Sequence, residues 1–96
     1  MGESEYVTNL RTVFDEYLEL FAEKHRAYGP EPIRESGELG VAIRLCDKAI
    51  RLKNQLLAHE QGVRYGIKFT SDTEDSWLDA LGYAAIGLMV RRGLWK

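Results

Sequence analysis

Charged side chains recur on one face of a predicted helix in the stretch GVAIRLCDKAIRLKN, residues 40–54. At about 100° per residue, Arg44, Asp47, Lys48 and Arg51 fall on a single strip within two turns, beside a wide apolar arc. Cations in this arrangement can bind phosphate oxygens, and a carboxylate among them can hold a metal ion or orient an arginine. A solvated, salt-bridged helix face gives the same pattern. Phosphate binding and simple solvation are therefore both open for this strip.

Acidic residues gather in a second stretch, SDTEDSWLD, residues 71–79. Asp75 and Asp79 lie one turn apart on one helical face, where two carboxylates repel unless a cation lies between them. Mg²⁺ suits this spacing because it takes one or two carboxylates and fills its other positions with water and phosphate. Acids in a first helical turn also complement the helix dipole, which explains Glu74 and Asp75. Asp79 lies past that turn inside an apolar run, so it is the strongest single candidate.

A third carboxylate pair, Glu35 and Glu38, occurs in ESGE. If the second helix begins before Gly40, Glu38 falls in its apolar arc, where an unpartnered charge is costly. If the helix begins at Gly40, both acids are loop or capping residues, and the sequence leaves the two cases open. His25 and His59 have no companions at zinc-ligand spacing. No serine or cysteine has the context of a nucleophile, so covalent catalysis has no candidate.

Three segments with apolar residues at helical spacing must position these side chains, and they predict a small all-α bundle. The predicted helices span residues 5–28, residues 36–58 or 40–58, and residues 71–90 or 72–90. The first should end near Tyr28-Gly29-Pro30, because glycine suits a helix cap and proline cannot continue the ladder. The third should begin with a capping box made by Ser71 and Glu74. Residues 29–37 and 59–72 are predicted to be loops.

The second and third helices are apolar over more than the single face that one small chain can cover. The apolar arc of the second spans roughly 200° at about 100° per residue. We therefore expect a homo-oligomer, a dimer or a tetramer, whose interface includes part of the Trp77–Val90 segment. Cys46 lies within the apolar pattern and is expected to be buried.

The composition indicates one soluble domain over residues 1–96, with 45% hydrophobic and 29% charged residues. A net charge of -2 gives no general attraction to nucleic acid, so that class of partner is not expected. The most apolar window, WLDALGYAAIGLMV, contains Asp79 and is shorter than the roughly 20 residues of a membrane span. One cysteine excludes an internal disulfide and favours a reducing compartment, so we expect a cytoplasmic protein.

Three stretches together, KHRAYG, GVAIRLCDKAIRLKN and EDSWLDALGYAAIGL, resemble the first nucleotide-modification-associated domain family of phages and bacteria. That family shows a lysine before Tyr-Gly, an R-L-x-D-K-x-x-R-L-x-N helix and an E-D-T-x-x-D-L-x-x-Y helix. The resemblance covers roughly residues 14–90, with Ser76 in place of the threonine. The matching residues are Lys24, Tyr28, Gly29, Arg44, Leu45, Asp47, Lys48, Arg51, Leu52, Asn54, Glu74, Asp75, Asp79 and Tyr83.

The predicted architecture is also similar to the all-α MazG-type nucleoside triphosphate pyrophosphohydrolases. These enzymes bind Mg²⁺ with an E-x-x-E pair on one helix and an E-x-x-D pair on the next, and they release pyrophosphate. Glu35 and Glu38 have the first spacing, whereas no E-x-x-D pair surrounds Asp79. The resemblance implies nucleotide binding with Mg²⁺, and it leaves hydrolysis by a metal-bound water open.

The residues and the resemblance together give an expected site. Its three groups are the metal ligands Asp47, Asp75 and Asp79, the catalytic candidates Lys48, Arg51 and Glu38, and the substrate-binding candidates Lys24, Tyr28, Arg44 and Asn54. The competing hypothesis is a noncatalytic accessory module that docks a protein or nucleic-acid partner through its charged helix face.

Overall fold

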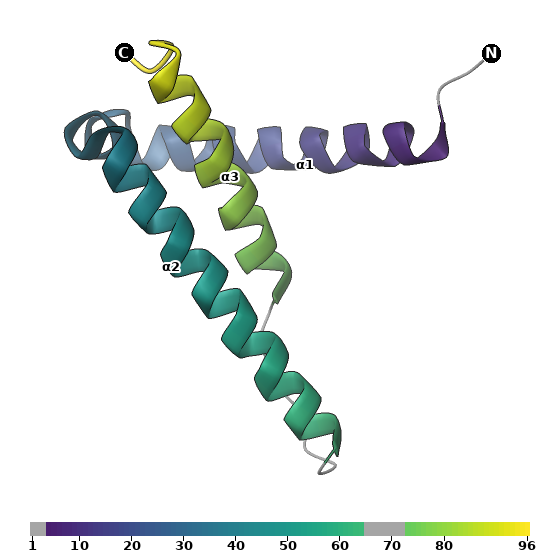
Figure 1. Cartoon of the computed structure of the whole chain (residues 1–96). Coiled ribbons are helices and arrows are strands. Elements are labelled where there is room, and N and C mark those ends of the chain that lie inside the picture. The colour runs from purple at the N-terminus through teal and green to yellow at the C-terminus, as the bar shows by residue number, and fades with distance from the viewer. Residues whose placement is uncertain (1–3, 65–72) are drawn as a thin grey trace.

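The computed structural model describes residues 4–64 and 73–96 of the chain. Within these ranges the chain forms three α-helices and no strand: α1 (Glu5–Tyr28), α2 (Glu31–Arg64) and α3 (Thr73–Arg91) (Figure 1). The predicted all-α fold is therefore confirmed.

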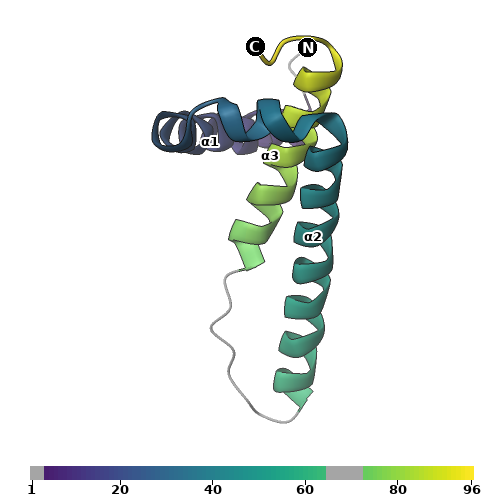
Figure 2. The ribbon, with the colours of Figure 1, turned by 90° about the vertical axis from the view of Figure 1, so that its left-hand side faces the viewer.

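Helices α2 and α3 lie side by side and antiparallel, and α1 crosses them where α2 begins and α3 ends (Figures 1 and 2). The N-terminal half of α1 extends past both helices (Figure 1). The molecule is accordingly flat, with extents of 49 × 43 × 22 Å. The one corner at which all three helices meet is the place where residues distant in sequence come together.

Both ends of α1 follow local capping chemistry. The Ser4 hydroxyl accepts a hydrogen bond from the Val7 amide at 3.2 Å, which satisfies one free N–H of the first turn. At the other end Gly29 has φ +71°, and its N–H donates to the His25 carbonyl at 2.9 Å. A left-handed residue of this kind ends a helix without steric cost only when it is glycine. The end predicted at Tyr28-Gly29-Pro30 is confirmed.

Helix α2 is longer at both ends than the sequence indicated. The loop predicted at residues 29–37 is wrong over residues 31–36, because proline is tolerated in a first turn and Pro32 occupies one. Only Gly37, with φ +66° and ψ −172°, breaks the helix, and the chain resumes its helical course beyond it. The loop predicted at residues 59–72 is also wrong up to Arg64, since extending an existing helix costs little. The predicted capping serine, Ser71, lies outside the described residues.

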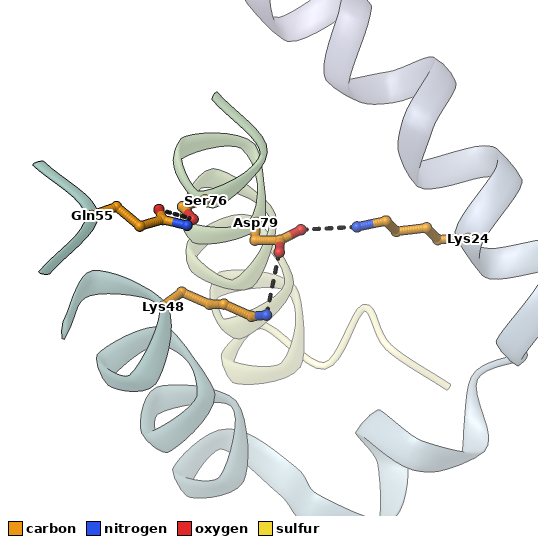
Figure 3. A network of polar contacts seen from close by, with 5 residues as sticks. All are labelled: Lys24, Lys48, Gln55, Ser76 and Asp79. Carbon is orange, nitrogen blue, oxygen red and sulfur yellow. Dashed lines mark hydrogen bonds and ion pairs between the residues drawn. The ribbon is translucent and has the colours of Figure 1, made fainter. Parts of the chain in front are cut away.

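The described part of the chain has a small core. Ile33, Val41 and Leu52, all on α2, are its buried apolar side chains. Ser76 on α3 is 2% exposed, and its hydroxyl donates a 2.7 Å hydrogen bond to Oε1 of Gln55 (Figure 3). Because a buried hydroxyl without a partner is costly, this pair helps to fix the register between α2 and α3.

Large apolar side chains remain exposed on all three helices. The exposed set includes Val7, Leu10, Phe14, Leu18, Leu39, Ile43, Ile50, Leu57, Trp77 and Leu88. The expectation that Cys46 is buried is wrong for the single chain, since the cysteine is exposed. It lies on the half of the α2 apolar arc that faces away from Val41 and Leu52. Within residues 4–64 and 73–96, neighbours cover only one half of that arc.

Candidate functional site

A cavity of about 380 Å³ opens at the corner where the three helices meet. Its walls come from the C-terminal half of α1, the first half of α2, the middle of α3 and the segment after α3. The volume is at the lower end of the range for small-molecule sites. The charged residues of the wall are Lys24, Arg44, Lys48 and Asp79, and the aromatic ones are Tyr17, Phe21, His25, Tyr28, Tyr83 and Trp95.

Asp79 lies between two lysines from different helices. One carboxylate oxygen, Oδ1, accepts a 2.9 Å hydrogen bond from Nζ of Lys24 on α1. The other, Oδ2, is 3.3 Å from Nζ of Lys48 on α2. Figure 3 shows the two ammonium groups approaching the carboxylate from opposite helices. Since Asp79 belongs to α3, this one side chain links all three helices.

A small residue on α3 permits the close approach of α1. Gly82 is buried, and a Cβ built there would lie 2.8 Å from Cζ of Tyr17 on α1. That separation is shorter than side chains tolerate, so the tyrosine ring can lie across α3 only because residue 82 is glycine. The crossing brings Lys24, two turns further along α1, to Asp79.

The surroundings of Asp79 and Tyr17 change their acidity in opposite directions. Burial by itself would raise the pKa of Asp79, but the hydrogen bonds and charges of Lys24 and Lys48 outweigh it and hold that pKa below its ordinary 3.8. Burial, and then the negative charge of Asp79, raise the pKa of the Tyr17 phenol above its ordinary 10.0, with a further contribution from Tyr83. At neutral pH the cavity therefore contains a carboxylate and a protonated phenol.

Arg44 adds a third cation to the wall, one helical turn before Lys48. It is half-buried, and among the residues that the structure describes it makes no ion pair. Among the described residues that line the cavity, three cations and one carboxylate give a surplus of two positive charges, with His25 not counted. In a chain with a net charge of -2, this surplus marks the cavity as a place for an anion.

Aromatic rings also line the cavity, and three of them pack together. The rings of Phe21 and His25 are stacked with centroids 5.5 Å apart, and Trp95 meets both edge-on at 6.1 and 5.5 Å. Nε1 of Trp95 donates a 3.0 Å hydrogen bond to the Pro30 carbonyl, which fixes the indole against the α1–α2 connection. Flat apolar surfaces of this kind can stack on a planar ring of a ligand.

Sequence reasoning missed Trp95, and the available signal was the glycine two residues before it. Gly93 has φ +71° and its N–H donates to the Val90 carbonyl at 3.1 Å, while the Leu94 N–H donates to the Met89 carbonyl at 2.9 Å. These two bonds make a Schellman cap, which reverses the chain after α3. The reversal returns Trp95 to the corner where α1 ends.

Five of the residues singled out from the sequence line the cavity together: Lys24, Tyr28, Arg44, Lys48 and Asp79. Lys24 and Tyr28 come from α1, Arg44 and Lys48 from α2, and Asp79 from α3. Tyr83, which belongs to the quoted motifs, lines the cavity as well.

The other predicted residues lie outside the cavity. Asp47, Arg51 and Asn54 are exposed on a neighbouring face of α2, and Asp75 is exposed in the first turn of α3. The break at Gly37 separates Glu35 from Glu38, so the two acids do not share one continuous helical face. Glu38 instead accepts a 2.9 Å hydrogen bond from Nη1 of Arg91 at the end of α3.

The residues of a single chain do not fit a resident Mg²⁺ ion at Asp79. Both oxygens of this carboxylate already face lysine ammonium groups, which repel a divalent cation. The other two predicted metal ligands, Asp47 and Asp75, do not line the cavity. Among the described residues, no three His, Cys, Asp or Glu side chains gather at metal-binding distances. The arrangement favours an anion over a cation at this corner.

Comparison with protein-family models, with curated proteins and with solved structures gives no match to this chain. No helix within residues 4–64 and 73–96 has the length and apolarity needed to cross a membrane.

Proposed function

We propose that this protein binds a nucleotide in the cavity between its three helices. The observation that carries the proposal is that Lys24 and Lys48 pair with one carboxylate, Asp79, in a cavity that Arg44 also lines. Ammonium and guanidinium groups are the side chains that most often bind phosphate oxygens, and half-burial reduces the screening of their charge. The phosphate end of the ligand lies among these cations.

The aromatic residues of the cavity wall favour a nucleotide over a simple inorganic anion. Phe21, His25 and Trp95 present ring surfaces on the same cavity wall that carries the cations. A nucleotide has both matching parts, an anionic phosphate and a planar base, and base–aromatic stacking contributes about 1–3 kcal/mol per base. The base therefore lies toward Trp95 in our proposal.

The MazG-like fold and hydrolysis with Mg²⁺ stay predictions that rest on the resemblance alone. Helix content and the antiparallel α2–α3 pair are compatible with that fold, but the expected metal ligands do not converge in one chain. We therefore propose nucleotide binding alone.

Titration calorimetry with nucleoside mono-, di- and triphosphates, with and without Mg²⁺, tests the proposal. Lys48→Ala removes a cavity cation and should weaken binding about tenfold or more, as expected for a lost charge-assisted hydrogen bond. Arg51→Ala is the matched control, because Arg51 is a cation on the same helix outside the cavity, and it should change affinity less than about twofold. A wild-type protein that binds no nucleotide would refute the proposal and favour the noncatalytic interaction module.

Self-assembly is a second proposal, and the uncovered face of α2 favours it. Leu39, Ile43, Ile50 and Leu57 recur at helical spacing along this face and are each between 49% and 75% exposed. Contiguous apolar surface of this kind usually marks an interface. Light scattering should therefore give a dimer or tetramer for the wild type and a smaller species for Ile50→Glu. Glu16→Lys, an exposed charge change on the acidic side of α1, should leave the mass unchanged.

A further inference from the structure

We infer that the ligand of this cavity is a phosphate monoester carried on a planar ring, a nucleoside monophosphate, and that it binds without a metal ion. The inference rests on the proposed function and specifies the ligand of the same site. Three features of the cavity carry it: its charge, the hydrogen-bond capacity of its cations, and its size.

The charge of the cavity matches one dianionic phosphate. Lys24, Arg44 and Lys48 oppose the single carboxylate of Asp79, so the wall has a surplus of two positive charges. A phosphate monoester carries about −1.5 to −2 charges at pH 7. A monoester therefore neutralises the cavity, and neither partner keeps an unpaired charge in a half-buried place.

The cations can bind this phosphate without releasing Asp79. Each lysine ammonium group has three N–H donors, and the contacts with Asp79 at 2.9 and 3.3 Å occupy one donor on each. Arg44 has five donors and makes no ion pair within the described ranges. A phosphate has enough oxygens to accept from all three side chains. Asp79 accordingly holds the lysines in place while their remaining donors face the ligand.

A triphosphate fits the same cavity poorly. It carries more negative charge than the surplus can neutralise, and the excess would need an added cation. Among the described residues of the wall, Asp79 is the carboxylate that could hold such a cation, and two lysines already engage it. A cavity of about 380 Å³ is at the lower end of the range for small-molecule sites, which favours the smaller of the two ligands.

Titration calorimetry can measure this preference directly. Adenosine, guanosine, cytidine and uridine are compared as nucleosides, 5′-monophosphates and 5′-triphosphates, each in a chelator and in Mg²⁺. For the base that binds best, the monophosphate in chelator should bind at least about tenfold more tightly than the triphosphate and the bare nucleoside. Added Mg²⁺ should change its affinity less than about twofold.

Substitution of Asp79 tests the charge count. Asp79→Asn raises the surplus from two to three, so the preference for monophosphate over triphosphate should shrink severalfold. Asp75→Asn removes a carboxylate one turn away that does not line the cavity, and it should leave the preference unchanged. Tighter binding of a triphosphate with Mg²⁺ by the wild type, or an unchanged preference in Asp79→Asn, would overturn the inference while the proposed function stands. Absence of binding by every phosphorylated ligand would overturn both.

Discussion

Replacement of Asp79 by asparagine should destabilise the fold at neutral pH, because one carboxylate joins three helices. Exposed ion pairs contribute about 0.2–1 kcal/mol each, and hydrogen bonds to charged groups about 1.5–3 kcal/mol. The Asp79 side chain is 20% exposed, but Lys24 is 49% exposed, so its contact belongs near the lower range. Lys48 is 27% exposed at the longer distance of 3.3 Å. Together these contacts give an expected loss of about 1–2 kcal/mol at pH 7.

The pH dependence follows from the lowered pKa of Asp79. A carboxyl group whose pKa is lower in the folded state stabilises the fold above its unfolded pKa, and loses this stabilisation as pH falls through the folded value. Wild type and Asp79→Asn should therefore differ at pH 7 and converge in acid, once the pH has fallen through the lowered pKa of Asp79, which lies below the ordinary 3.8. The two variants differ only at residue 79, so the difference between them isolates this side chain.

Urea unfolding at pH 7 and at a series of acid pH values, at one fixed protein concentration, measures this difference in stability. The concentration is fixed because self-assembly would make the apparent stability depend on it. Asp75→Asn serves as the control, and its free energy of unfolding should stay within about 0.5 kcal/mol of wild type. Equal stability of wild type and Asp79→Asn at pH 7, or a difference that persists unchanged in acid, would refute the reasoning.

Two further variant pairs test the packing around the cavity. Gly82→Ala should lower the free energy of unfolding by about 1–3 kcal/mol, because its Cβ would meet the Tyr17 ring. Gly87→Ala should change it by less than about 1 kcal/mol, since its Cβ would lie 3.4 Å from Val41 Cγ1. Chemical denaturation of both variants measures the two effects. Nucleotide binding should change the tryptophan fluorescence of the wild type and of Trp77→Phe, because both keep Trp95, which lines the cavity. It should not change the fluorescence of Trp95→Phe, whose remaining Trp77 is 60% exposed outside the cavity. An unchanged signal in Trp77→Phe, or a retained one in Trp95→Phe, would contradict the placement of the base.

Features set by local chemistry could be predicted from the sequence. The end of α1 at Gly29 follows from a glycine in the left-handed region, and the structure agrees. Asp79 stood out because neither the helix dipole nor solvation explains an acid inside an apolar run. Its position in the cavity, between two lysines, accounts for that exception.

The charged strip of α2 shows why helical spacing alone cannot define a site. The strip borders a wide apolar arc on α2. Helix α3 and the corner where the helices meet cover only the half of that arc around Val41 and Leu52. Arg44 and Lys48 lie on the edge next to that half and line the cavity, whereas Asp47 and Arg51 lie further round and are exposed. Which half of a wide arc is covered depends on tertiary packing, so periodicity could not separate the two pairs.

The extent of α2 and the role of Trp95 depended on weaker signals. Residues 59–64 lack an apolar period, yet the helix continues through them because each added residue gains a backbone hydrogen bond. Trp95 reaches the cavity only through the chain reversal at Gly93 and its hydrogen bond to the Pro30 carbonyl. Both outcomes depend on contacts that form after the helices are placed.

The most direct test of a phosphate site at this corner is the position of the phosphorus atom in a crystal structure with a nucleoside monophosphate bound. Our account predicts phosphate oxygens within hydrogen-bond distance of Nζ of Lys24, Nζ of Lys48 and the guanidinium group of Arg44, with the base toward Trp95. A phosphate bound instead on the exposed face that carries Asp47 and Arg51, or a metal ion bound by Asp75 and Asp79, would contradict it.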